Sequence, residues 1–439
     1  MVSRPLIARA PSKHAEPIDS SANDDNADEE KRLADKFAAH RHLVPLVAQN
    51  PDVIFLNAAS APPSNLLVHE AITRYSAQAL YEASPHTKWR ETREEARGLI
   101  ARCINAEDAT TIAFTRDTTE ALGSFIRCVG FEPGDNVVTV DAEHPNQTLC
   151  WLALRGAGLE VRQVPTISTE TETETERRSG SLVVVDAETL RPYVDSRTRA
   201  IGISSITFDS GHQNDVKSIC AEYRPRGIHV LADITQHVGF ARIDVKDLGV
   251  SAAAFSLHKG LNTPTGIGAL YISPQAFTEL DDPTPPFVSM EAVKNLNESL
   301  VVKVDDALEL HPNARRFEHA NMSLVGVTAA AAYTRFYLDV LGPADVEAHL
   351  YALTDLLGKE CDRLGIRVVN PRERGKRAPH ITILALSKEW GPYLGGPGGA
   401  RVTMNRLGAR VSFGFYNSAE DVRRFARVLE LGVAQGLRA

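Results

Sequence analysis

Helical stretches with one apolar face alternate with short β-rich runs through the first two thirds of the chain. This alternation constrains the fold more than any other feature. Clear amphipathic stretches are residues 66–81 and 92–104. The β-rich runs are 111–115, 136–140, 181–185, 200–204, 229–233, 252–256 and 268–272. The segments between them are long enough for crossover helices, so the pattern predicts an α/β fold around a mainly parallel seven-stranded sheet.

After about residue 289 the pattern changes to longer helices mixed with short strands, which predicts a smaller C-terminal α+β domain over residues 289–439. Residues 31–288 then form the large domain. A Gly-rich stretch, 391–399, has no strand–turn–helix setting around it, so we expect a mobile lid or connecting loop rather than a phosphate loop. The expected helices are 325–341, 344–364 and 419–435, and the expected strands are 366–369, 380–386 and 409–415.

Two segments carry too few bulky apolar residues to predict packed structure. Residues 1–30 are rich in Ser, Asp, Asn, Ala and Glu, so we expect a disordered tail. Its three basic residues before Glu16 faintly resemble a transit peptide, but the acids that follow favour a plain tail. Residues 169–176 read TETETETE, which has strand period but no apolar face, so a solvated loop is expected.

Composition and charge argue against several classes of function. The 439 residues hold 48 Lys and Arg against 56 Asp and Glu, a formal charge of −8, with no basic patch, so no nucleic-acid partner is expected. No stretch approaches the roughly 20 apolar residues of a membrane helix, so no membrane association is expected. The five cysteines are far apart and odd in number. They argue against a disulfide framework or a metal site and favour a reducing, cytoplasmic compartment.

Two charged residues follow β-rich runs near the middle of the chain. Asp233 ends one run, and Lys259 follows another, with His258 before it and a Gly-containing turn after it. Open α/β sheets bind ligands at the carboxyl ends of their parallel strands, so both side chains are expected at one edge. A carboxylate for the ring nitrogen and an amine for an aldehyde could hold a pyridine ring. Taken singly, such an Asp is more often a helix cap and such a Lys a surface charge.

The segment around these residues, LADITQHVGF followed by AAAFSLHKGLNTPTGIGALYI, resembles the pyridoxal-phosphate region of class V aminotransferases. This family includes cysteine desulfurases, isopenicillin N epimerase-like proteins and carbon–sulfur lyases. Further family-like segments, in the expected order, are FLNAASAPPSN, AFTRDTTEAL, AEHPNQTLCW, RRFEHAN and ARVSFGFYNSAEDVRRF. The resemblance extends from about residue 55 to about residue 428. It implies fold type I, the cofactor pyridoxal 5'-phosphate (PLP), an N-terminal segment packed on the small domain, and a homodimer with shared active sites.

The resemblance also implies catalytic roles for individual residues. Lys259 would bind the cofactor aldehyde and carry the Cα proton of the substrate. Asp233 would pair with the protonated pyridine nitrogen, a cation that favours the ionised carboxylate. Gln236 would hydrogen-bond the phenolic oxygen of the ring, and His144 would stack on the ring face.

The phosphate and the substrate would be held by other residues of the same motifs. Arg410 would clamp the α-carboxylate of an amino-acid substrate, because a guanidinium binds a carboxylate with two hydrogen bonds. Asn57 would line the substrate pocket. The phosphate would be bound by four residues, two of which, the threonines, open an expected helix. They are Thr118, Thr119, Ser256 and His258.

The positions at which the chain departs from the family pattern reduce the number of reactions to be expected. Cysteine desulfurases carry a catalytic Cys shortly before the carboxylate-binding Arg, but residues 387–410 contain none, and Cys361 lies on an expected helix. A desulfurase that forms a persulfide is therefore not expected. Thr207 and Phe208 replace a Ser-Asn pair of desulfurases, which favours the epimerase and lyase branch and leaves Thr207 as a cofactor contact.

A further departure concerns the contact between subunits. The usual Gly-Thr-Pro after Arg-Phe-Glu has become His319-Ala320-Asn321. In the family this Thr reaches the phosphate of the neighbouring subunit. Asn321 or Ser323 would have to take its place here.

The sequence favours β-elimination of a cysteine S-conjugate, since such a lyase needs no catalytic Cys. Transamination, epimerisation and decarboxylative deamination on the same site remain open, because the bond that breaks depends on its alignment with the cofactor. Epimerisation needs a second proton donor, for which His237 and His212 are candidates, each with a structural alternative. A catalytically silent relative predicts loss of Lys259 or Asp233, and both are present.

Overall fold

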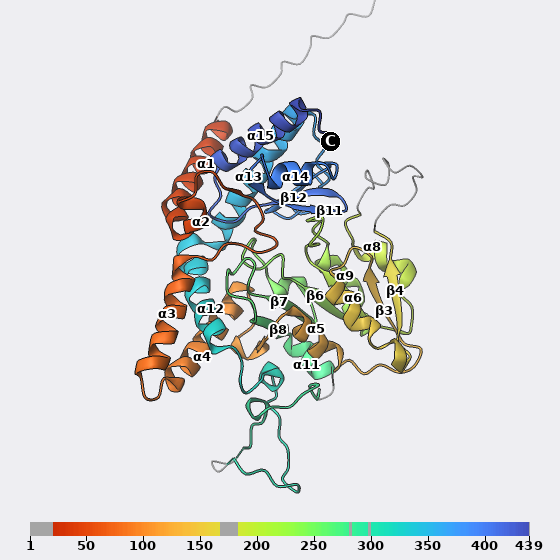
Figure 1. The fold of residues 1–439 in the computed structure, drawn as a ribbon. Helices are drawn as coiled ribbons and strands as arrows, with labels where there is room; N and C mark the ends of the chain where they lie inside the picture. The colour runs from red at the N-terminus through yellow and green to blue at the C-terminus, as the bar shows by residue number, and fades with distance from the viewer. Residues whose placement is uncertain (1–20, 167–182, 281–282, 297–299, 439) are drawn as a thin grey trace, which may run out of the picture.

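The computed structural model describes residues 21–166, 183–280, 283–296 and 300–438, and a seven-stranded sheet lies at its centre (Figure 1). Of residues 21–27 only the backbone is described. Strands from β7 to β4 run parallel, and β8 is antiparallel to both neighbours, which confirms the predicted α/β class with a mainly parallel sheet. The order is β2 (Ile112–Thr115), β8 (Gly268–Ile272), β7 (Ala252–Ser256), β6 (His229–Asp233), β5 (Thr198–Ser204), β3 (Asn136–Val140) and β4 (Glu160–Val164).

Most strand predictions match the structure, and one is wrong. The predicted bounds of β3, β6, β7 and β8 are those observed, while β2 and β5 begin within two residues of the expected position. The described part of 181–185 forms no strand, and the seventh strand is β4 instead. β4 is an edge strand that pairs with β3 alone and carries polar residues that are mostly exposed to solvent. It therefore lacks the apolar run that marks the buried strands.

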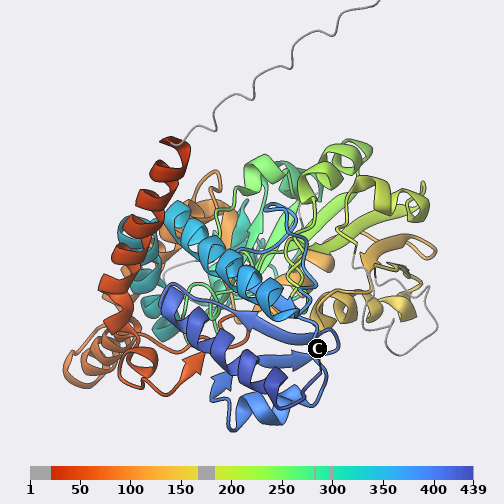
Figure 2. The same cartoon turned by 90° about the horizontal axis from the view of Figure 1, so that it is seen from above.

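Helices cover both faces of the sheet (Figures 1 and 2). One face is buried under α5, α6 and α11, with Phe125 and Trp151 in the core between them. The other is buried under α4, α9 and α12, with Ile100 and Tyr223 in the core. These helices are α4 (His86–Cys103), α5 (Thr118–Ile126), α6 (Pro145–Leu152), α9 (Val216–Tyr223), α11 (Pro274–Glu279) and α12 (Leu324–Phe336), with the short α8 (Ala187–Leu190) and α10 (Val245–Leu248) between strands.

The carboxyl ends of β5, β6 and β7 meet at one edge of the sheet. In the pairing register Ser204 lies beside Asp233, and Asp233 lies beside Ala254. Because the three strands end at nearly the same level, the residues that follow them are brought to one place. The C-terminal part of the chain packs above this edge, blue in Figure 1.

This C-terminal part contains α13 (Pro343–Leu364), α15 (Ala419–Ala434) and a three-stranded antiparallel sheet in the order β11 (Thr403–Asn405), β12 (Gly408–Ser412) and β9 (Ile381–Leu384). Two expectations are wrong here. Residues 366–369 make an isolated bridge at Val368 rather than a strand. The Gly-rich stretch is not a loop throughout, because α14 (Trp390–Gly395) occupies its first half and is anchored by buried Trp390 and Leu394.

Helix α1 (Ser21–His40) begins inside the segment expected to be a disordered tail, so that expectation is wrong for residues 21–30. The helix is held against α13, since Phe37 stacks on His349 at 4.2 Å and Lys36 pairs with Asp345 at 2.7 Å. Residues 1–20 and the TETETETE segment lie outside the described residues. Beyond α2 (Pro45–Ala48), β1 (Ile54–Phe55) pairs with β10 (Ala400–Arg401), so the N-terminal segment lies against the C-terminal part.

Helices α3 (Leu66–Tyr81), α4 and α12 lie side by side along one flank of the molecule (Figure 1). Helix α12 continues into a π-helical turn, Tyr337–Leu341. The combined segment Leu324–Leu341 has the length and hydropathy of a membrane span, contrary to the expectation that no stretch approaches one, and 56 % of it is buried inside the protein.

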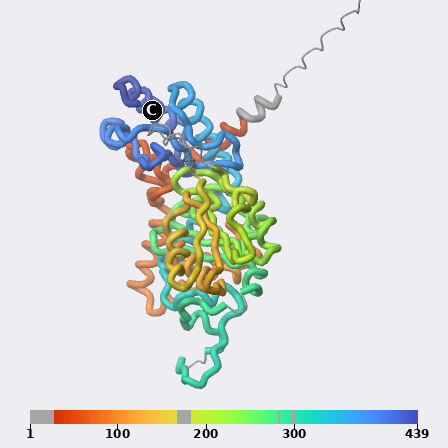
Figure 3. Tube along the Cα trace, turned by 90° about the vertical axis from the view of Figure 1, so that its right-hand side faces the viewer, coloured from red at the N-terminus to blue at the C-terminus, as the bar shows by residue number. Residues whose placement is uncertain are grey.

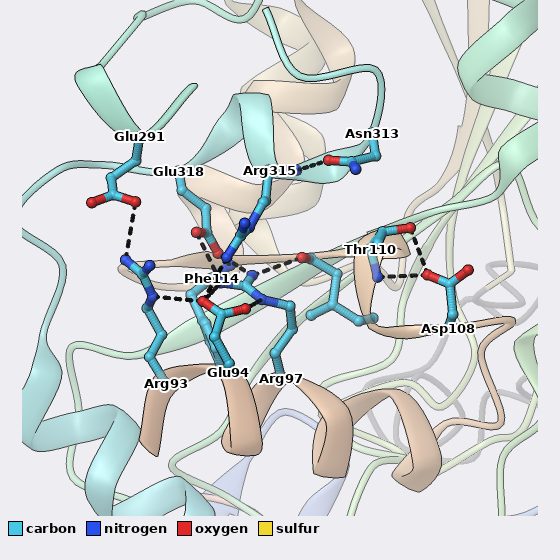
Figure 4. Close-up of polar contacts among 11 residues, drawn as sticks. Arg93, Glu94, Arg97, Asp108, Thr110, Phe114, Glu291, Asn313, Arg315 and Glu318 are labelled. Atoms are coloured by element: carbon cyan, nitrogen blue, oxygen red, sulfur yellow. Dashed lines mark hydrogen bonds and ion pairs between the residues drawn. The ribbon is translucent and has the colours of Figure 1, made fainter. Parts of the chain in front are cut away.

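A buried ion pair joins α4 to the chain segment that precedes α12 (Figure 4). Arg97 pairs with Glu318 of the RRFEHAN motif, and both side chains are almost fully buried. Arg97 also donates to the carbonyl of Ile112 at 2.9 Å, and Glu318 accepts from the amide of Phe114 at 2.8 Å. The pair therefore fixes β2, the strand that leads into α5.

Removing one partner of this pair is expected to be costly. Arg97→Leu leaves the Glu318 carboxylate buried without its counter-charge, so we expect the free energy of unfolding to fall by about 3–5 kcal/mol. Arg102→Leu, on the same helix, breaks an exposed pair with Asp339 and is expected to cost about 1 kcal/mol or less. Urea unfolding of both variants measures the difference, and equal losses would contradict a structural role for the buried pair.

Candidate active site

A cavity of about 450 Å³ lies at the carboxyl ends of the parallel strands, under the C-terminal part. A larger cleft of about 790 Å³ lies between α1 and α13 and is lined by none of the residues predicted for the site. The smaller cavity is lined by nine of the twelve: Thr118, Thr119, His144, Asp233, Gln236, Ser256, His258, Lys259 and Arg410. Side-chain chemistry rather than volume therefore identifies the candidate site.

Asp233 is the last residue of β6 and is buried at the base of the cavity. Its Oδ1 accepts the N–H of Thr235 at 2.8 Å, which holds the carboxylate in the turn after the strand. No described residue donates to Oδ2. One oxygen is thus used for positioning, and the other is available to a cation in the cavity.

Lys259 faces the same cavity from the turn after β7. Its backbone is held by a close approach of two glycines, since a Cβ on Gly260 would lie 2.1 Å from the carbonyl oxygen of Val238 and 2.9 Å from Gly239. Burial lowers the pKa of Lys259 to about 8, while the Asp233 carboxylate opposes this shift and the Arg410 guanidinium adds to it. Roughly a tenth of the amine is therefore neutral and nucleophilic at pH 7, far more than for an ordinary lysine.

Three hydroxyl groups gather where α5 begins. The Oγ1 of Thr118 lies 2.8 Å from Ser256 Oγ and 3.0 Å from Thr235 Oγ1, and the Thr118 amide donates to Ser256 Oγ. Thr119 Oγ1 accepts from the side-chain amide of Asn146 at 2.7 Å. Hydroxyls combined with a helix N-terminus favour a phosphate group.

His144 caps the N-terminus of α6 and is half-buried in the lining of the cavity. Its Nδ1 accepts the N–H of Asn146 at 3.2 Å, and its ring meets Phe208 edge to face at 4.9 Å. Burial lowers the pKa of His144, so the ring is held neutral. A neutral, fixed imidazole is suited to lie flat on an aromatic ligand.

Gln236 and Arg410 each keep an N–H group that no described residue accepts. The Gln236 side-chain amide donates to the carbonyl of Ala59 at 2.9 Å. Arg410, on β12, donates from Nη1 to the carbonyl of Phe208 at 2.5 Å, while its buried Nε has no partner among the described residues. Burial lowers the pKa of Arg410. A buried guanidinium with an unused donor is a suitable partner for a carboxylate ligand.

Three predicted site residues do not line the cavity. The Thr207 hydroxyl is used in the turn after β5, where it bonds to Ser210 Oγ at 2.6 Å and accepts the amide of His212 at 3.0 Å. Asn57 accepts from the Thr403 hydroxyl at 2.8 Å, so Thr403 faces the cavity instead. Asn321 is exposed, outside the cavity of its own chain. Ser323, the alternative to Asn321, caps α12.

The two histidines considered as second proton donors are structural. His237 is buried, with Nε2 3.0 Å from the carbonyl of Arg242 and Nδ1 3.3 Å from Ser205 Oγ. His212 forms a bridge with Arg377 in the turn after β5. Neither lines the cavity.

Sequence reasoning missed several residues of the site. Phe208, Thr235 and residues of the β11 hairpin line the cavity. Phe208 and Thr235 lie in segments already compared with the family, but neither was predicted as a site residue. Glu143 lies beneath His144 and accepts the N–H of Ser204 at 2.6 Å; burial raises the pKa of this carboxyl group to about 8. The pattern Glu-His before a helix was a signal that could have found Glu143. The hairpin residues Thr403 and Asn405 carried no such signal.

None of the five cysteines lines the cavity, and all are free thiols. Burial raises the pKa of Cys361 to about 12, as expected for a core residue of α13. Cys128 and Cys150 are partly exposed, and burial raises both of their pKa values. Among the residues that the structure describes, no group of three His, Cys, Asp or Glu side chains could hold a metal ion.

The donor set of the cavity fits PLP. A carboxylate with one free oxygen, a partly neutral amine, an amide and a hydroxyl cluster at a helix N-terminus match its pyridine nitrogen, aldehyde, phenolic oxygen and phosphate. The mainly parallel sheet beneath the cavity is the fold type I architecture of PLP enzymes. Fold and site together define this class.

Comparisons with known proteins give the family. The family model for class V aminotransferases matches residues 53–425. An uncharacterised protein of Schizosaccharomyces pombe is 44 % identical over 91 % of this chain and 88 % of its own, and an uncharacterised aminotransferase of the same yeast is 41 % identical over 91 % and 96 %. The chain therefore belongs to the class V aminotransferases and is a PLP-dependent enzyme.

Solved structures support the fold. The cysteine desulfurase CsdA of Escherichia coli superposes with a TM-score of 0.73 at 20 % identity, covering 92 % of this chain and 99 % of its own. The cystine C–S lyase C-DES, in complex with cysteine persulfide, gives 0.73 at 18 % identity, covering 88 % and 98 %.

Proposed function

We propose that Lys259 binds the PLP aldehyde and that Asp233 Oδ2 accepts a hydrogen bond from the pyridine nitrogen. The partly neutral Lys259 amine and the free carboxylate oxygen support this assignment. Gln236 donates to the phenolic oxygen, His144 lies on the ring face, and the phosphate binds at Thr118, Thr119, Ser256 and His258. PLP in this position supplies an electron sink for a carbanion at the substrate Cα.

The lowered pKa of Lys259 gives a test of this assignment. A neutral amine attacks an aldehyde and a protonated one does not, so covalent uptake of PLP by the cofactor-free protein should quicken as pH rises. The midpoint is expected near 8. An ordinary lysine, with a pKa of about 10.4, would show a rate that still rises well above that pH. Stopped-flow absorbance measures the profile, and a midpoint near 10 would contradict the proposed environment of Lys259.

We further propose that the reaction is β-elimination from an S-substituted L-cysteine. The observation that carries this proposal is a PLP-type cavity with a free Arg410 donor and no cysteine in its lining. Arg410 binds the α-carboxylate, Lys259 Nζ removes the Cα proton, and the carbon–sulfur bond at Cβ breaks with departure of the thiolate. With one water, the products are pyruvate, ammonia and the thiol.

Product analysis with a panel of S-substituted L-cysteines tests the reaction. We expect pyruvate, ammonia and free thiol in equal amounts, and unchanged turnover in the double variant Cys128→Ala/Cys150→Ala. A protein-bound persulfide, or loss of turnover in that variant, would point to desulfurase chemistry. A keto acid with pyridoxamine phosphate would show transamination, and Cα deuteration without elimination would show epimerisation. Any of these products would overturn the lyase assignment and leave the cofactor site intact.

We also propose a homodimer in which a projecting segment, the described residues of 288–308, packs against a second copy of this chain. This segment extends away from the body of the molecule (Figures 1 and 3). Its apolar side chains are exposed, an unfavourable arrangement for a monomer. They are Val288, Met290, Leu300, Val301, Val302, Val304 and Leu308.

Sedimentation equilibrium tests this assembly. The unsubstituted protein is expected to be a dimer, and Val302→Asp/Val304→Asp is expected to shift it toward monomer. Leu431→Asp, at an exposed leucine of α15, should leave the dimer intact. A monomeric wild-type protein, or equal behaviour of the two variants, would contradict the proposed interface.

We propose a cytoplasmic location, which is supported by five free thiols in a chain without a disulfide. Cell fractionation tests it, and recovery in an oxidising compartment would contradict it.

A further inference from the structure

His380 reaches from the C-terminal part of the chain to a residue of the cofactor cavity. It precedes β9, its relative exposure is 0 %, and its Nε2 lies 3.3 Å from Oε1 of Gln236. Gln236 belongs to the turn after β6, far away in the sequence. His380 itself does not line the cavity.

The neighbours of Gln236 fix which way its side-chain amide points. The carbonyl of Ala59 can only accept, so the Gln236 atom at 2.9 Å from it must be the NH₂ group. The other end, Oε1, then faces His380 and requires a donor. His380 therefore carries its proton on Nε2, and its Nδ1 is a buried lone pair without a partner among the described residues.

The His380 ring is held rigidly in this orientation. It stacks on Phe240 with 3.7 Å between ring centroids and 4° between planes, and its carbonyl accepts the amide of Phe413 at 2.9 Å. Phe240 follows Gly239, the glycine that packs against Gly260 beside Lys259. Burial holds the pKa of His380 well below its ordinary value, so the ring stays neutral and donates from one nitrogen.

We propose that His380 is a positioning residue that orients the Gln236 amide so that its second N–H points at the phenolic oxygen of the cofactor. Without this donor the Gln236 amide loses one of its two anchors and can rotate. His380 belongs to the C-terminal part of the chain and Gln236 to the large domain. Cofactor binding therefore depends on how these two parts pack against each other. This inference rests on the proposed role of Gln236.

A double-mutant cycle separates this role from a general contribution to packing. His380→Phe keeps a ring on Phe240 and removes the donor, His380→Gln restores a donor at a similar reach, and Gln236→Leu removes the amide. The dissociation constant of PLP and the absorbance maximum of the bound cofactor are measured for each variant. His380→Leu is measured as a second variant without the donor, so that the cycle can be completed if the His380→Phe variant does not fold.

We expect His380→Phe to weaken PLP binding about 3- to 10-fold, the loss of one hydrogen bond, and to shift the absorbance maximum. His380→Gln should restore both. In the Gln236→Leu background the same His380→Phe change should alter PLP binding less than about 2-fold. Equal weakening in both backgrounds, or no change in either, would overturn the inference. If the unsubstituted protein binds no PLP, the proposed function itself fails.

Discussion

Lys259→Ala is expected to abolish the visible absorbance of the covalently bound cofactor and to lower turnover by about 10²–10⁴-fold, the usual contribution of a positioned general base. The expectation follows from the environment of the amine. Lys259 is partly buried, its pKa is lowered to about 8, and it shares one cavity with Asp233 and Arg410. No other lysine lines that cavity among the described residues.

Absorbance spectroscopy and steady-state kinetics of Lys259→Ala measure both effects. Lys217→Ala, an exposed lysine paired with Asp247, is the matched control and should behave as wild type. Retention of the cofactor spectrum and of turnover in Lys259→Ala would mean that a different lysine carries the cofactor.

Asp233→Asn is expected to lower turnover by about 10²–10³-fold while PLP still binds, because the substitution removes the charge but keeps the shape. The Thr235 amide can still donate to the remaining carbonyl oxygen, so the turn after β6 is preserved. In the proposed site, the substitution would remove the negative partner of the pyridine nitrogen, and this partner would favour the protonated form of that nitrogen.

The kinetic constants of Asp233 variants distinguish the loss of this charge from a folding defect. Asp233→Asn should reduce kcat with little change in the melting temperature, and Asp233→Glu should recover part of kcat because the charge returns at a longer reach. A drop in stability with normal kcat for the folded fraction would assign Asp233 a purely structural role.

The buried part of the sheet could be predicted from the sequence because its strands are short apolar runs with clear ends. The bounds of β3, β6, β7 and β8 were predicted correctly for this reason. The edge strand β4 could not, since its polar residues face solvent and its pairing with β3 is a long-range contact. Helix α1 was missed in the same way, because its stability comes from packing on α13 rather than from its own charged sequence.

The cavity residues at or just after the ends of the strands could be predicted, because the strand ends fix their place. Lys259, Asp233 and Ser256 are examples. The sequence does not show which side chains near the strand ends point into the cavity. Thr207 and Asn57 were therefore predicted as site residues, although their side chains are used in other contacts. His380 was missed because it approaches Gln236 through packing of the C-terminal part, which no local pattern reveals.

The central claim, that this chain is a PLP enzyme whose cofactor is carried by Lys259, is tested most directly by borohydride reduction of the PLP-loaded protein followed by peptide mass mapping. The account predicts one pyridoxyl-phosphate addition, on the peptide that contains Lys259. No adduct, or an adduct on a different lysine, would contradict the assignment of the site.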